Sequence, residues 1–194
     1  MQILDEYKGE VLFIVHAPDI GPRPETEVIW KRILGPERTL MQKTLVRQNR
    51  TRIKQSLEIA GKKGVPVIYI SALGHDGKDT LNKILSLIKK KPRTIEIHEK
   101  IIGRLKPKQI IDALTTGNII PTNITFLGQL REDCVKTAIL ATRKALPNTP
   151  ITIMGGKGTI FMGGDCSRIK LKKIFSQNKI SRTKKLKAST WHKK

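Results

Sequence analysis

The sequence predicts a single α/β domain, a three-layer α/β/α sandwich with a mostly parallel central sheet of about six strands. The first observation is size, because 194 residues are enough for one domain with a buried core and few for two. The second is composition: 38% of the residues are hydrophobic and only 4% aromatic, which indicates an aliphatic core suited to buried parallel strands. The third is an alternation of strand-like and helix-like segments along the first 167 residues, which predicts right-handed βαβ crossovers.

The alternating segments can be placed one by one. Short apolar runs predict strands at 11–15, 67–70, 94–98, 124–127 and 151–154. Apolar positions at helical spacing predict helices at about 39–61, before 92, around 110–114 and at 131–146. Prolines at positions 18, 22 and 24 exclude regular structure from the loop after the first strand. In such folds ligands bind at the carboxyl ends of the strands, so functional side chains are expected there.

The charge is strongly positive and unevenly distributed. Lys and Arg number 38 against 16 acidic residues, a formal net charge of +22. From Arg168 to the end the chain has eleven Lys or Arg and no acid, which is half of the net charge. We therefore divide the chain into an α/β domain at 1–167 and a partly mobile basic C-terminal extension at 168–194. From about Asn178 the extension is predicted to be a solvated tail.

Two interpretations of this basic tail stay open. It can bind nucleic acid, another polyanion or an acidic partner, with an affinity that falls steeply as salt is added. Alternatively, it is a solvated terminus without a partner.

Other features of the sequence predict a cytoplasmic protein with no transmembrane segment. The first apolar run, Val11–Val15, is far too short to cross a bilayer and follows acidic Asp5 and Glu6. Only two cysteines are present, Cys134 and Cys166, which favours a reducing compartment over a disulfide framework.

The strongest local signal is the segment that leads from Gly128 to Cys134. A buried strand runs into the glycine, turns through five residues and opens a helix whose first turn presents the cysteine. Backbone N–H groups at a helix N-terminus favour a thiolate and can hold an oxyanion. Glu132 and Asp133 are adjacent and oppose a second negative charge. From spacing alone, Cys134 can equally be one more small buried residue.

Several segments resemble the isochorismatase-like superfamily, which includes nicotinamidases and related amidases. The segment 128–135 resembles its strand–Gly–loop–Cys-Val segment, and Ile97-His-Glu-Lys100 resembles its lysine-bearing strand end. The runs 65–70 and 11–18 are similar to its second and first strands. The resemblance covers roughly residues 10 to 160 and implies the isochorismatase-like fold.

The resemblance also implies roles for individual residues. In that family a cysteine attacks a carbonyl, an aspartate at the end of the first strand acts as the base, and a lysine supports it. Cys134 and Lys100 occupy the cysteine and lysine positions, but His16 occupies the aspartate position. Three interpretations stay open: His16 replaces the carboxylate as base, Asp19 reaches back into the site, or the site has lost its activity.

The sequence therefore predicts a cysteine hydrolase for a small amide or other C–N substrate. The alternative is a catalytically inactive scaffold that acts as a basic binding module for a polyanion or acidic partner. Members of the family often hold a metal, but the equivalent loops offer only Asp19, His75 and Asp76, so neither a metal nor a cofactor is predicted. The resemblance is also compatible with a homo-oligomer.

Overall fold

The computed structural model describes residues 5–17, 32, 36–72, 77–99, 104–128, 134–155 and 168–183. Six strands form one sheet in the order β3-β2-β1-β4-β5-β6, and every neighbouring pair is parallel. The strands are β1 (Tyr7–Val15), β2 (Val67–Ala72), β3 (Thr94–Glu99), β4 (Ile119–Gly128), β5 (Ile151–Met154) and β6 (Ile180–Thr183). The predicted parallel sheet and three-layer sandwich are confirmed.

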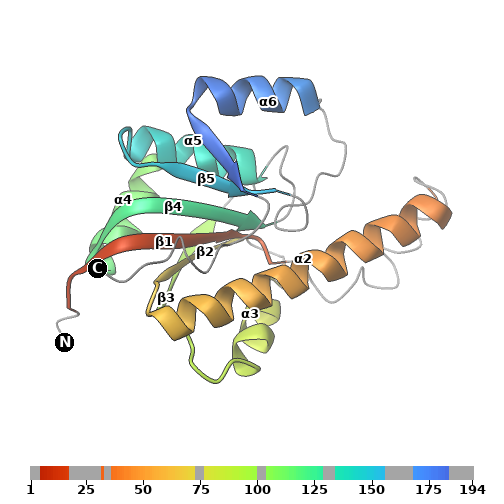
Figure 1. The fold of residues 1–194 in the computed structure, drawn as a ribbon, viewed down its shortest axis with the longest axis horizontal. Helices are drawn as coiled ribbons and strands as arrows, with labels where there is room; N and C mark the ends of the chain where they lie inside the picture. The colour runs from red at the N-terminus through yellow and green to blue at the C-terminus, as the bar shows by residue number, and fades with distance from the viewer. Residues whose placement is uncertain are drawn as a thin grey trace.

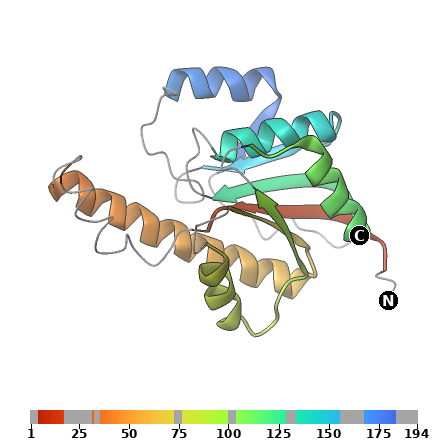
Figure 2. The same ribbon diagram turned by 180° about the vertical axis from the view of Figure 1, so that it is seen from behind.

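The helices cover both faces of this sheet. They are α2 (Pro36–Lys63), α3 (Gly77–Ser86), α4 (Pro107–Thr116), α5 (Lys136–Ala145) and α6 (Arg168–Gln177). Figures 1 and 2 show α2 and α3 on one face and α4 and α5 on the other, with the first half of α2 extending beyond the sheet. Within the described residues, no helix is long and apolar enough to cross a membrane.

The strand order creates a particular place in the middle of the sheet. The chain starts at β1, moves outward through β2 and β3, and returns by α4 to β4, which lies on the other side of β1. From β4 it moves outward in the opposite direction through β5 and β6. The connections that leave β1 and β4 therefore diverge at the carboxyl ends of these two strands. In open α/β sheets this switch point is where ligands bind.

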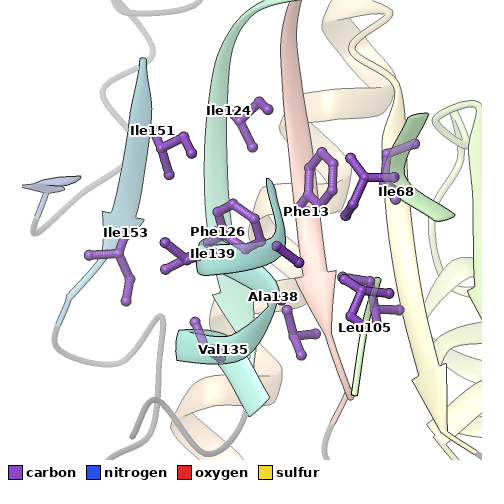
Figure 3. Close-up of a cluster of buried hydrophobic side chains, with 14 of the residues drawn as sticks. Phe13, Ile68, Leu105, Ile124, Phe126, Val135, Ala138, Ile139, Ile151 and Ile153 are labelled. Carbon is purple, nitrogen blue, oxygen red and sulfur yellow. The ribbon is translucent and has the colours of Figure 1, made fainter. Parts of the chain in front are cut away.

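Two hydrophobic clusters, one on each face, hold the layers together. On one face Phe13 of β1 packs against Phe126 of β4, with ring centroids 4.9 Å apart, and Figure 3 shows Val135, Ala138 and Ile139 in the same cluster. On the other face Leu12 belongs to a cluster formed with α2 and α3. Since neighbouring residues of β1 point to opposite faces, both faces need apolar side chains. This explains why a continuous apolar run marked this strand in the sequence.

The C-terminal extension is more ordered than the sequence predicts. The chain was expected to be solvated from about Asn178, but residues Ile180–Thr183 form the parallel edge strand β6 beside β5. Ile180 is buried, as are Leu171 and Phe175 of α6. The expectation of a solvated tail is therefore wrong for residues 180–183. Ile180 is buried and is followed by the exposed Ser181 and Arg182, so this segment has no periodic signal and composition alone suggested a tail.

One arginine ties this last unit to the rest of the domain. Arg143 of α5 donates hydrogen bonds from Nη1 to the carbonyl oxygens of Pro147 and Thr149, at 2.8 and 2.9 Å. Its Nε donates to the carbonyl oxygen of Asn178, at 3.1 Å, in the turn between α6 and β6. The side chain therefore fixes two turns at once.

Replacing Arg143 with Met is expected to lower the free energy of unfolding by about 1–3 kcal/mol. The change removes three charge-assisted hydrogen bonds but keeps much of the aliphatic side chain. Urea unfolding followed by circular dichroism measures the effect, with Lys144→Met at the neighbouring exposed position as the control. Equal midpoints for the two variants would show that the three contacts contribute nothing.

Candidate active site

The two strands at the switch point end side by side. Val15 of β1 pairs with Gly128 of β4. Gly128 has a φ of 144°, and a Cβ atom at this position would overlap the carbonyl oxygen of Val15. Only glycine allows this close approach of two backbones. The segments that carry His16 and Cys134 therefore leave the sheet from adjacent positions.

His16 directly follows β1 and adopts an unusual backbone conformation. Its φ is 49°, in the left-handed region that residues other than glycine occupy rarely, although histidine is enriched there. Its backbone N–H donates to the carbonyl oxygen of Ile70 in β2, at 3.0 Å, which holds the turn in place. The side chain is 11% exposed, and its Nε2 lies 3.1 Å from Oε2 of Glu99.

Glu99 is the last residue of β3 and its side chain is only 2% exposed. It follows Ile97 by two residues and therefore lies on the same face of the sheet, the face covered by α4 and α5. A buried carboxylate is costly unless it is paired and hydrogen-bonded, and His16 supplies such a partner. The sequence analysis did not identify Glu99. The available signal was its spacing: Ile95, Ile97 and Glu99 are two residues apart, so the acid lies on the same face of the strand as two apolar residues.

The contact determines which nitrogen of His16 can act as a base. A carboxylate only accepts hydrogen bonds, so Nε2 of a neutral His16 carries the proton and donates it to Glu99. Nδ1 then carries the lone pair. On unrelated folds a histidine oriented by a carboxylate activates serine and cysteine nucleophiles, but there the carboxylate binds Nδ1 and Nε2 is the base, so in His16 the two nitrogens exchange roles.

Cys134 lies on the same face of the sheet as Glu99. Its side chain is buried, at 2% exposure, in the cluster that contains Val15, the residue before His16. Val135 has helical backbone angles, φ −66° and ψ −42°, and α5 begins at the next residue. The cysteine is thus placed at the start of a helix, as predicted. Residues 129–133, which were expected to form the turn before Cys134 and to include the helix start at about Arg131, lie outside the described residues.

Other predicted site residues cannot be placed. Lys100, Asp19 and Cys166 lie outside the described residues, and so do His75 and Asp76. The roles of Lys100 and Asp19 therefore stay predictions. Among the residues that the structure describes, no group of three or more His, Cys, Asp or Glu side chains could hold a metal ion.

A second polar group lies near the same ends of β2 and β3. The hydroxyl of Ser71 donates to Oε1 of Glu96, at 2.6 Å, and lies 2.9 Å from Nδ1 of His98. Because the single hydroxyl proton of Ser71 is directed to Glu96, Nδ1–H of His98 is the donor in the second contact. His98 in this tautomer cannot remove the serine proton through Nδ1. This arrangement therefore does not activate Ser71 as a nucleophile, and Cys134 is the better candidate.

Fold and site together describe a parallel α/β protein with a cysteine and a histidine–carboxylate pair at its switch point. No protein-family model and no curated protein matches the sequence. Solved structures do match. The chain resembles an isochorismatase family protein, at 10% identity and a TM-score of 0.50, over 90% of this chain and 97% of that one.

Two further structures are similar. One is the YcaC gene product of Escherichia coli, described as an octameric hydrolase of unknown specificity, at 10% identity and a TM-score of 0.50, over 90% of this chain and 74% of that one. The other is the MAR1 ribonuclease of Caenorhabditis elegans, at 14% identity and a TM-score of 0.48, over 91% and 76%. The fold assignment rests on the first two matches. The chain has the isochorismatase-like α/β fold.

Proposed function

We propose that this protein is a cysteine hydrolase that acts on a small amide or another C–N substrate, with Cys134 as nucleophile and His16 as base. The observation that carries the proposal is the contact between His16 and the buried Glu99. In the isochorismatase-like family the base is a carboxylate at the position of His16. A histidine there without a carboxylate beside it would suggest an inactive site. A carboxylate from β3 instead accepts a hydrogen bond from the histidine and orients its ring.

The proposed reaction has two stages, acylation of Cys134 and hydrolysis of the resulting thioester. Nδ1 of His16 takes the thiol proton, and the thiolate of Cys134 attacks the substrate carbonyl carbon. Backbone N–H groups at the start of the α5 helix stabilise the oxyanion of the tetrahedral intermediate. The intermediate collapses to a thioester as the C–N bond breaks, and His16 returns the proton to the leaving amine. Water then hydrolyses the thioester, with His16 again as base. Lys100 favours the thiolate if it lies near the sulfur.

The alternative is an inactive scaffold in which Cys134 only fills the core. In that case the thiol is an ordinary buried one, and Glu99 and His16 form a structural pair. Asp19 as the base is the remaining alternative. A cytoplasmic location, assembly into a homo-oligomer and the absence of a cofactor stay predictions as well.

The rate of Cys134 alkylation by iodoacetamide as a function of pH separates these alternatives. We expect the rate to reach half of its maximum at least one pH unit below the value of about 8.5 that holds for an unperturbed thiol. In His16→Ala the profile returns toward that value, and the rate at pH 7 falls about tenfold because fewer thiolates are present. Lys100→Ala tests the supporting lysine, and Asp19→Asn the third candidate base.

Mass spectrometry of the Cys134 and Cys166 peptides reports both thiols in the same sample, so that Cys166 serves as the internal reference. A Cys134 that reacts no faster than Cys166, with no response to any of the three changes, would mean that the site is inactive. The proposed hydrolase would then be rejected. A response to Asp19→Asn alone would identify Asp19 as the base in place of His16.

A further inference from the structure

We propose that α6 and β6 form a surface that binds the sugar–phosphate backbone of a nucleic acid. We call this the α6–β6 surface; it is defined by five exposed cations on α6, on β6 and in the turn between them, Lys170, Lys172, Lys173, Lys179 and Arg182. It lies at the β6 edge of the sheet, whereas His16 and Cys134 lie at the switch point between β1 and β4. The inference is therefore independent of the proposed hydrolase.

Acidic residues are unevenly distributed along the described part of the chain. From residue 134 to residue 183 the described residues include no Asp or Glu. They include nine cations: Lys136, Arg143, Lys144, Arg168, Lys170, Lys172, Lys173, Lys179 and Arg182. The described residues of the half that contains β1, β2 and β3 include acidic residues, among them Glu10, Glu58 and Glu96. In the full sequence, residues 134–194 have 15 Lys or Arg and one Asp, which is +14 of the net charge of +22.

The cations of this surface are held on ordered elements. Leu171 and Phe175 of α6 are buried, while the lysines between and around them are exposed. Arg143 donates to the carbonyl oxygen of Asn178 and so fixes the turn that precedes Lys179 and β6. Ten helical residues span about 15 Å, a length over which one strand of a duplex has about four phosphates.

The composition of the surface favours phosphate over other partners. A protein interface has an apolar centre, and a membrane-binding helix exposes large apolar side chains beside its cations. Among the described residues, the exposed large hydrophobic side chains all belong to other segments: Leu40, Met41, Leu87, Ile111 and Ile120. The one aromatic residue of α6, Phe175, is buried and cannot stack on a base. Contacts to phosphates with little sequence preference are therefore expected.

The test uses the full chain, with Lys170, Lys172 and Lys173 all changed to Gln, and a control of equal charge. In the control Lys89, Lys90 and Lys91 become Gln, because these exposed lysines precede β3 at the opposite edge of the sheet. Fluorescence anisotropy measures binding to a labelled 20-nucleotide oligo(U) and to a 20-base-pair DNA duplex as a function of salt. Urea midpoints verify that both variants are folded.

We expect the α6 variant to bind the single strand at least tenfold more weakly than the native chain at 0.1 M NaCl. The slope of log K against log salt should decrease in magnitude by about 2, as for the loss of three phosphate contacts to a single strand. The control variant should lose no more than about twofold. Comparison with the duplex shows whether a single strand is enough for full affinity. Binding to either form through α6 supports a phosphate-binding surface.

Four outcomes would overturn the proposal. The first is that the native chain binds neither nucleic acid at 0.05 M NaCl, and the second is that the two triple variants lose affinity equally. A loss confined to a variant with Lys184, Lys185 and Lys187 changed to Gln would assign the binding to the terminal residues instead. Retention on phosphatidylserine vesicles without binding to either oligonucleotide would assign the charge to a membrane surface.

Discussion

Glu99→Gln is expected to lower the alkylation rate of Cys134 at pH 7 by about tenfold and to lower any hydrolytic rate by about 10²-fold or more. Glutamine has the shape of glutamate but no charge, so the change removes the carboxylate that accepts the hydrogen bond from Nε2 of His16. The new amide can also donate to Nε2 and so move the histidine proton to Nδ1. In that tautomer Nδ1 cannot take the proton of Cys134.

A double-mutant cycle makes this prediction specific. If Glu99 acts through His16, the variant with both His16→Ala and Glu99→Gln reacts no more slowly than His16→Ala alone. Glu96→Gln is the matched control, because Glu96 lies on the same strand but contacts Ser71. Equal effects of Glu99→Gln and Glu96→Gln on Cys134 would show that the contact with His16 has no special role. In that case both acids of β3 would have a structural role only.

The sequence predicted the parts of the fold that are buried on both faces. Val11–Val15 and Val67–Ile70 are continuous apolar runs, and every residue in them is buried in the sheet. Strands β1 and β4 begin earlier than predicted, in residues that lack this apolar pattern. Strand β4 begins at Ile119, before Pro121. Its pairing with β1 shifts register between Gly9 and Glu10, where β4 contains one extra residue, Thr122.

The candidate site was predicted only in part, for a physical reason. Cys134 and His16 could be found because they follow strands that a local pattern identifies. Glu99 could not be recognised as the partner of His16, since this contact joins residues 83 positions apart and depends on the strand order. The left-handed conformation of His16 also has no local signature. Tertiary contacts of this kind become visible only when β1, β2 and β3 are seen side by side.

Gly128→Ala is expected to lower the free energy of unfolding by about 3 kcal/mol or more and to disturb Cys134 at the same time. A Cβ atom at Gly128 would overlap the carbonyl oxygen of Val15, and the φ of 144° is strained for any residue with a side chain. The atoms nearest to this Cβ position are all backbone atoms of Val15, so no side chain can rotate to relieve the overlap. The strands must separate where they end, and Val15 immediately precedes His16.

Gly64→Ala is the matched control for the strain in Gly128→Ala. Gly64 also has a positive φ, 69°, but no atom lies within 4 Å of the position of its Cβ. Its replacement should therefore cost only the conformational strain, about 1–2 kcal/mol, and leave the alkylation profile of Cys134 unchanged. Urea unfolding and the alkylation profile are measured on both variants. If both lose the same stability and Cys134 is unaffected, the close approach of β1 and β4 does not position the site. A larger loss in Gly128→Ala with a changed profile would mean that the contact between two strand ends sets the geometry of the nucleophile and its base.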